Sequence, residues 1–153
     1  MKSTNQAIAA TLAVALNPLS GFRHETVPVP GWGTDVVVRA PSPSDHLFHA
    51  QALRLAAGIE AGVDDQEIIE SKLRAPGTDY TRASAALFVR TVFVQTEAGP
   101  RRLCQDENLD EVAAAFGPIH AQLVAKALDL GNLIEGAAET AKKPSRKRRT
   151  SAS

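Results

Sequence analysis

Two histidines near the start of a predicted helix are the first candidates for chemistry in this sequence. His46 and His49 lie three positions apart and follow Asp45, so a helix would place both rings on one face. Imidazole rings arranged in this way are common zinc ligands, but a zinc site needs at least a third protein ligand. The sequence offers no convincing third ligand, and we interpret Asp45, His46 and His49 as polar surface at a helix start.

The single cysteine is the second candidate. Cys104 and His120 could in principle form a thiol nucleophile and its base. A small apolar side chain that fills space near a turn is the simpler interpretation of Cys104. The acidic pairs at 64–65 and 106–107 fit helix starts, where the helix dipole favours carboxylates, better than acid–base catalysis. With no glycine-rich phosphate loop either, we expect a protein that is not an enzyme and uses no metal or cofactor.

Charge is divided unevenly along the chain. Six of the 17 Lys and Arg residues lie within 142–149, so the remaining 11 cations face 17 anions in the rest of the sequence. A basic tail on an acidic body is typical of an interaction tail and could attract a second copy of the chain. The tail could also contact phosphates, but it lacks aromatic residues that stack on bases, so we do not expect nucleic acid as the partner. The basic residues are Lys142, Lys143, Arg146, Lys147, Arg148 and Arg149.

The cellular compartment is indicated by two further features. One cysteine cannot form an internal disulfide, which fits a reducing compartment. No apolar run reaches the roughly 18 residues that span a bilayer, so we expect no membrane association. The apolar run from Ala7 to Leu16 resembles part of a signal peptide, but its apolar core is short and it follows a polar start. We therefore expect a cytoplasmic protein.

The N-terminal third predicts a helix and a β-hairpin. Ile8, Leu12 and Leu16 fall on one face of a helix over residues 4–16, which ends at Pro18. Residues 24–39 follow as a hairpin whose first strand alternates with prolines, which is typical of an edge strand. The pattern places Val36 and Val38 on one face of the second strand, and Val37 with Arg39 on the other. The turn carries Trp32, which could be a core residue or an exposed anchor for a partner.

The next helix has a recognisable start. Ser42 is the predicted N-cap, Pro43 the first helical residue and Asp45 the third. After that helix, Asp64 or Asp65 caps a short helix, and residues 80–95 form an apolar segment. Periodicity alone cannot assign that segment to helix or strand, and we favour a helix. The helix that starts at Pro43 is predicted to bury Phe48, Ala52, Leu55 and Ile59. The short helix capped by Asp64 or Asp65 is predicted to bury Ile68, Ile69 and Leu73.

The last third predicts two helices and a tail. Asp106 or Asn108 caps a short helix that ends at Gly117, and Pro118 opens the final helix. The stripe of the final helix is Ile119, Leu123, Ala127, Leu130 and Ile134. Together these elements predict an α+β fold: one mainly helical domain over residues 1–135 with an N-terminal hairpin, and a disordered basic tail over 136–153.

The order of several motifs resembles the tail assembly chaperones of long-tailed phages. The first half carries a Val-x-Val-Pro-x-Trp-Gly segment at 27–33, then a valine-rich strand that ends in Arg39 and a helix led by serine. The second half resembles the family in an apolar segment at 87–94, a Gly99 turn, an acidic helix start at 106–108 and a long final helix that ends near Leu133. The likeness covers residues 5–135.

The resemblance implies a function for the chain. Proteins of this family bind the long helical tape measure protein in the host cytoplasm, keep it soluble, help to recruit tail tube subunits and are absent from the mature virion. A longer product made by ribosomal frameshift near the end of the gene is also common in the family. The residues that we expect at the partner-binding surface are Leu12, Leu16, Trp32, Val37 and Phe48.

Two other functions remain open on the sequence. The chain could be a structural virion component such as a head–tail connector or a tail terminator. It could also be a nucleic-acid-binding adaptor that uses the basic residues at 142–149.

Overall fold

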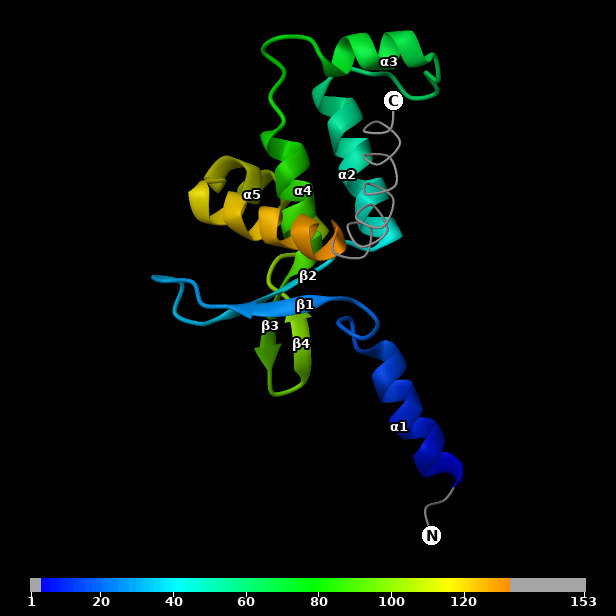
Figure 1. Ribbon diagram of the computed structural model, residues 1–153, viewed down its shortest axis with the longest axis vertical. Coiled ribbons are helices and arrows are strands. Elements are labelled where there is room, and N and C mark those ends of the chain that lie inside the picture. Colours follow the sequence, from blue (N-terminus) through cyan, green and yellow to red (C-terminus); the bar gives the residue numbers. More distant parts are fainter. Residues whose placement is uncertain (1–3, 133–153) are drawn as a thin grey trace, which may run out of the picture.

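A computed structural model describes residues 4–132 of the chain and shows a small antiparallel sheet with helices packed on one side of it (Figure 1). The sheet has the strand order β1-β2-β3-β4. The strands are β1 (His24–Val27), β2 (Val36–Arg39), β3 (Val92–Thr96) and β4 (Gly99–Arg102). The helices are α1 (Thr4–Leu16), α2 (Pro43–Ala56), α3 (Gln66–Leu73), α4 (Thr81–Thr91), the 3₁₀ turn η1 (Asp106–Asn108), α5 (Leu109–Ala115) and a final helix over 118–132.

The mixed α and β architecture of the prediction is confirmed, and the sheet is larger than predicted. The hairpin over 24–39 forms as β1 and β2, with Val27 opposite Val36 and His24 opposite Arg39. As predicted, β1 is an edge strand. The structure adds β3 and β4 on the other side of β2, so a segment from the second half of the chain completes the sheet. None of the helices within residues 4–132 is long and apolar enough to cross a membrane.

The segment at 80–95 divides between helix and strand. It is helical only as far as Thr91, and β3 begins at Val92, so the preference for a helix throughout was wrong for the last residues. Thr91 is fully buried, and its hydroxyl donates a hydrogen bond to the Leu87 carbonyl at 2.7 Å. From Val92 onward, pairing with Val38 replaces the helical hydrogen bonds. Non-local pairing with β2 therefore sets the point at which the helix ends.

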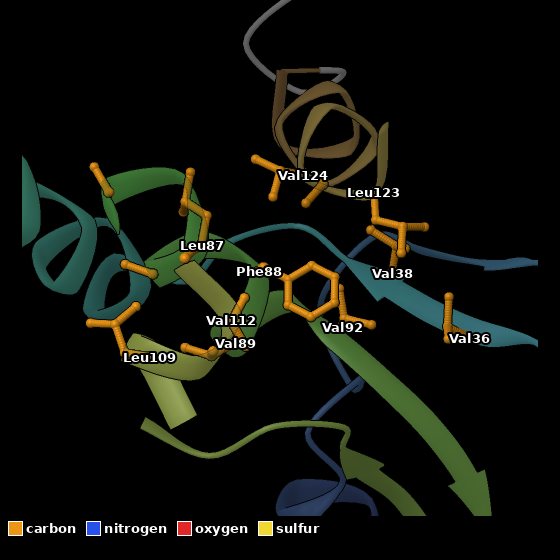
Figure 2. Close-up of a cluster of buried hydrophobic side chains, with 14 of the residues drawn as sticks. Val36, Val38, Leu87, Phe88, Val89, Val92, Leu109, Val112, Leu123 and Val124 are labelled. Atoms are coloured by element: carbon orange, nitrogen blue, oxygen red, sulfur yellow. The ribbon is translucent and has the colours of Figure 1, made fainter. Parts of the chain in front are cut away.

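The core lies between the sheet and the helices, as Figure 2 shows. Val36 and Val38 point from β2 into this core, where Phe88 of α4 lies near the centre. The final helix contributes Leu123, Val124, Ala127 and Leu130, which confirms most of its predicted stripe, whereas Ile134 and the predicted tail lie outside the described residues. The opposite face of the sheet buries a smaller cluster of Leu19, Val37 and Phe93.

Two predicted apolar stripes were partly wrong. The start of α2 is as predicted, with Ser42 and Asp45 forming a capping box. However, Leu55 is 71% exposed, because α2 packs on α4 through the side that carries Ala52 and His49. Helix α3 begins after the predicted cap Asp65 but has no buried residue, since it lies at the edge of the molecule away from the sheet (Figure 1).

Candidate functional site

Helix α1 is the most exposed apolar element of the described chain. Its 13 residues carry no charge and none of them is buried. Ile8, Leu12 and Leu16 are 58%, 52% and 71% exposed, on the stripe that the sequence predicted. In Figure 1 the helix projects from the body, and it packs substantially against no other described element. Within residues 4–132, nothing therefore covers this apolar stripe.

The physical chemistry of α1 favours a partner. An isolated helix shorter than about 12–15 residues is marginal in water, and most helices in proteins are stabilised by packing of an apolar face. Ala7, Ile8, Thr11 and Leu12 form an open apolar surface along one face of α1. Covering this surface with apolar side chains would both remove hydrocarbon from water and stabilise the helix.

A buried arginine joins the end of α1 to the body. The Arg39 guanidinium donates to the Pro18 carbonyl at 3.0 Å and to the Arg90 carbonyl at 3.3 Å. It also forms an ion pair with Asp45 and lies 4.5 Å from the ring centroid of Phe22. One side chain therefore connects the loop after α1, strand β2 and the start of α2, and it fixes where α1 leaves the body.

A second set of charges continues from this arginine. Arg90 donates hydrogen bonds to both carboxylate oxygens of Asp106, at 2.8 and 3.0 Å, and Arg102 donates to Asp106 at 2.6 Å. Burial alone would raise the pKa of Asp106, but the hydrogen bonds and charges of Arg90 and Arg102 outweigh it and hold the pKa below its usual range. Burial opposes the charge of Arg90, but its bonds to Asp106 and Asp45 raise its pKa overall. Both shifts favour the charged forms of Arg90 and Asp106.

The five residues predicted at the partner surface are not brought together. Leu12 and Leu16 lie exposed on α1. Val37 is 6% exposed and packs with Leu19 on the sheet. Phe48 lies under Arg90, whose guanidinium carbon is 4.3 Å from the centroid of the Phe48 ring. Of these four residues, Leu12 and Leu16 on α1 are therefore the ones with exposed apolar side chains.

Trp32 lies at the edge of the main core. It is half-buried and packs against the main core, edge-on to Phe88 with a centroid distance of 6.1 Å. His120 completes the aromatic cluster, with centroids 5.5 Å from Trp32 and 4.9 Å from Phe88. Burial lowers the pKa of His120, and its Nδ1 accepts a hydrogen bond from the Gly117 amide. Both side chains therefore hold the β1–β2 turn to the helices.

The residues considered for catalysis have structural surroundings. His49 is hydrogen-bonded to the Ala83 carbonyl at 2.9 Å, and His46 is exposed. Within the part of the chain that the structure describes, no group of three His, Cys, Asp or Glu side chains could hold a metal ion. His120 lies among aromatic rings, and burial raises the pKa of the Cys104 thiol, which favours its unreactive protonated form.

The charge network was missed by the sequence analysis. Its members, Arg39, Asp45, Arg90, Arg102 and Asp106, come from five separate segments. Asp45 was recognised as a helix-start acid, and Asp106 as a possible cap. Neither assignment predicts that both acids bind Arg90, which lies 45 residues after Asp45 and 16 residues before Asp106. The one available signal was Arg39 at the end of a buried strand, because a charge in that place needs a partner.

Comparisons with known proteins identify the family of this chain. No curated protein matches it significantly. A solved structure described as the tail assembly chaperone of bacteriophage HK97 is similar, with 25% sequence identity and a TM-score of 0.52, covering 79% of this chain and 96% of that one. The family model described as phage tail assembly chaperone matches residues 10–143, which is most of the sequence. The chain therefore belongs to the phage tail assembly chaperone family.

Proposed function

We propose that this protein binds the tape measure protein in the host cytoplasm, keeps it soluble, promotes assembly of the tail tube and is left out of the mature virion. The observation that carries the proposal is the uncovered stripe of Ile8, Leu12 and Leu16 on α1. The family supplies the context, since its members assist tail assembly.

The stripe suits a long helical partner. An amphipathic helix buries its own apolar face against another apolar helix through residues spaced three and four apart, and Ile8, Leu12 and Leu16 on α1 are each spaced four apart. The absence of charge in α1 removes any electrostatic selection, so one such helix can receive many similar segments along a long partner. A stripe of this size gives modest affinity at each contact, which fits a chaperone that must later be released.

Co-expression with the tape measure protein of the same phage tests the proposal. The wild-type chain should move the tape measure protein into the soluble fraction. Leu12→Asp places a charge in the stripe and should abolish that effect. Ala10→Asp is the matched control, because it adds the same charge to the same helix on the side opposite Ile8 and Leu12, and it should retain the effect.

Two results would contradict the proposal. Tape measure protein that stays insoluble beside the wild-type chain would remove its central claim. Detection of the chain by mass spectrometry at stoichiometric levels in purified virions would instead favour a structural component of the particle.

A further inference from the structure

A cavity of about 490 Å³ lies where the end of α1, the second face of the sheet and the start of α2 meet. Four arginines line it: Arg39, Arg90, Arg101 and Arg102. Arg39, Arg90 and Arg102 pair with only two carboxylates, Asp45 in the wall and Asp106 beside it. The cavity is therefore a local region of positive charge on a body in which anions outnumber cations.

The four guanidinium groups differ in their freedom to bind a ligand. Arg39, Arg90 and Arg102 are held in place by Asp45, Asp106 and backbone carbonyls. Arg101 is exposed at the rim and forms no ion pair with any carboxylate of residues 4–132. The cavity therefore combines fixed positive charges with one guanidinium that still has its donors to offer.

The remaining wall indicates the kind of anion. Leu16, Pro18 and Phe93 supply apolar surface, and Ser42 and Ser44 supply hydroxyl groups. Leu16 and Arg101 also line a neighbouring hollow of about 300 Å³ against the last turn of α1, so the cavity is continuous with the α1 surface. A site that joins apolar walls to a bidentate donor suits a carboxylate on a polypeptide. The basic tail of the chain itself carries the wrong charge for the cavity.

We propose that this cavity binds a carboxylate side chain of an acidic segment in the partner polypeptide, with Arg101 as its direct ligand. The inference rests on the proposed function in that the partner is a polypeptide, and it adds a chemical criterion for the segments that bind. An amphipathic helix laid along Ile8, Leu12 and Leu16 with a Glu or Asp at its end would occupy both surfaces at once.

The test uses two synthetic peptides and the full-length chain. One fluorescein-labelled amphipathic peptide carries leucines on one face and glutamates at one end, and its matched peptide carries glutamines in their place. Fluorescence anisotropy should show tighter binding of the glutamate peptide to the wild-type chain. Arg101→Gln should weaken that binding by about tenfold, the effect of losing one charge-assisted hydrogen bond, and should make the two peptides equal. Arg101→Lys should fall between wild type and Arg101→Gln.

Arg74→Gln is the control variant, because it removes the same charge from an exposed site at the end of α3, away from the cavity. It should leave the binding of both peptides unchanged. Equal affinity of the two peptides for the wild-type chain, or an equal loss in Arg74→Gln, would overturn the proposal. Displacement of the peptide by inorganic phosphate, or tighter binding of single-stranded DNA, would assign the cavity to phosphates and overturn it as well. Because no tape measure protein is present, these results are independent of the solubility experiment.

Discussion

Arg39 and Asp45 form an ion pair at the junction of β2 and α2, where both side chains are almost completely removed from solvent. Asp45 has a second role there, because its carboxylate accepts a hydrogen bond from the Ser42 amide and so completes the capping box of α2. The Arg39 guanidinium also holds the loop that follows α1 through the Pro18 carbonyl. One buried pair therefore organises both the helix start and the exit of α1 from the body.

The first prediction concerns this pair. Asp45→Ala leaves the Arg39 charge buried without its partner and removes one of the two hydrogen bonds of the α2 capping box, so the free energy of unfolding should fall by about 3–5 kcal/mol. Denaturant titrations followed by the fluorescence of Trp32, the only tryptophan, measure the change. Asp110→Ala is the control, since the Arg82–Asp110 pair is largely exposed, and its loss should cost at most about 1 kcal/mol. Similar losses in both variants would show that the Arg39–Asp45 pair has no special role.

Part of this organisation could be predicted from the sequence and part could not. The helix at 4–16, the hairpin and the capped start of α2 depend on short-range patterns: the spacing of apolar residues, turn glycines and the Ser42–Asp45 box. The end of α4 at Thr91 depends on pairing between Val92 and Val38, which are far apart in the chain. The same reason hides the partners of Arg39 and Arg90, because local sequence carries no information about which distant carboxylate a buried arginine will meet.

The candidate site, too, could be predicted from the sequence only in part. The exposed stripe of α1 was predicted from its own periodicity, because no other described element packs substantially against it. Val37 and Trp32 were predicted at the partner surface, but distant segments pack on both: Leu19 and Phe93 on Val37, and Phe88 on Trp32. Their burial is decided by tertiary contacts that a local pattern does not contain.

The second prediction concerns acid. The pKa of Asp106 is lower in the folded chain than its ordinary value, so its interactions with Arg90 and Arg102 contribute stability above the unfolded pKa of about 3.9. This contribution should be lost as the pH falls through the still lower folded pKa. Urea titrations between neutral pH and about pH 3 should show a steep loss of stability in the wild type and a shallower one in Asp106→Asn. Parallel curves for the two proteins would contradict the role of Asp106.

The third prediction concerns His120. Burial lowers its folded pKa below the unfolded value of about 6.5, so the unfolded chain takes up this proton first as the pH falls. Protonation would also turn Nδ1, which accepts from the Gly117 amide, into a donor. Stability should therefore decline as the pH falls from 7 through about 6.5 towards the folded pKa. His120→Phe keeps a ring in the cluster and should reduce that decline, measured as the slope of unfolding free energy against pH. An unchanged slope would assign the pH dependence to the other histidines.

The fourth prediction concerns the Cys104 thiol. Burial is the main cause of its raised pKa, with the Glu111 charge adding to it and Arg102 opposing it. The thiolate is the reactive form, so a thiol-specific reagent at neutral pH should modify the native chain much more slowly than the urea-unfolded chain. Raising the pH should speed the native reaction. Equal rates in the native and unfolded chains would show that Cys104 is freely accessible.

The last prediction separates binding from folding. Helix α1 buries no side chain, so Leu12→Asp should change the free energy of unfolding by no more than about 0.5 kcal/mol, as surface substitutions usually do. Leu123→Ala, in the core beneath the final helix, should cost about 2–5 kcal/mol. Denaturant titrations of the two variants make the comparison. If Leu12→Asp keeps full stability and still fails to solubilise the tape measure protein, the failure lies in the surface of α1 and not in the fold. A large loss of stability in Leu12→Asp would instead show that α1 packs on the body in solution.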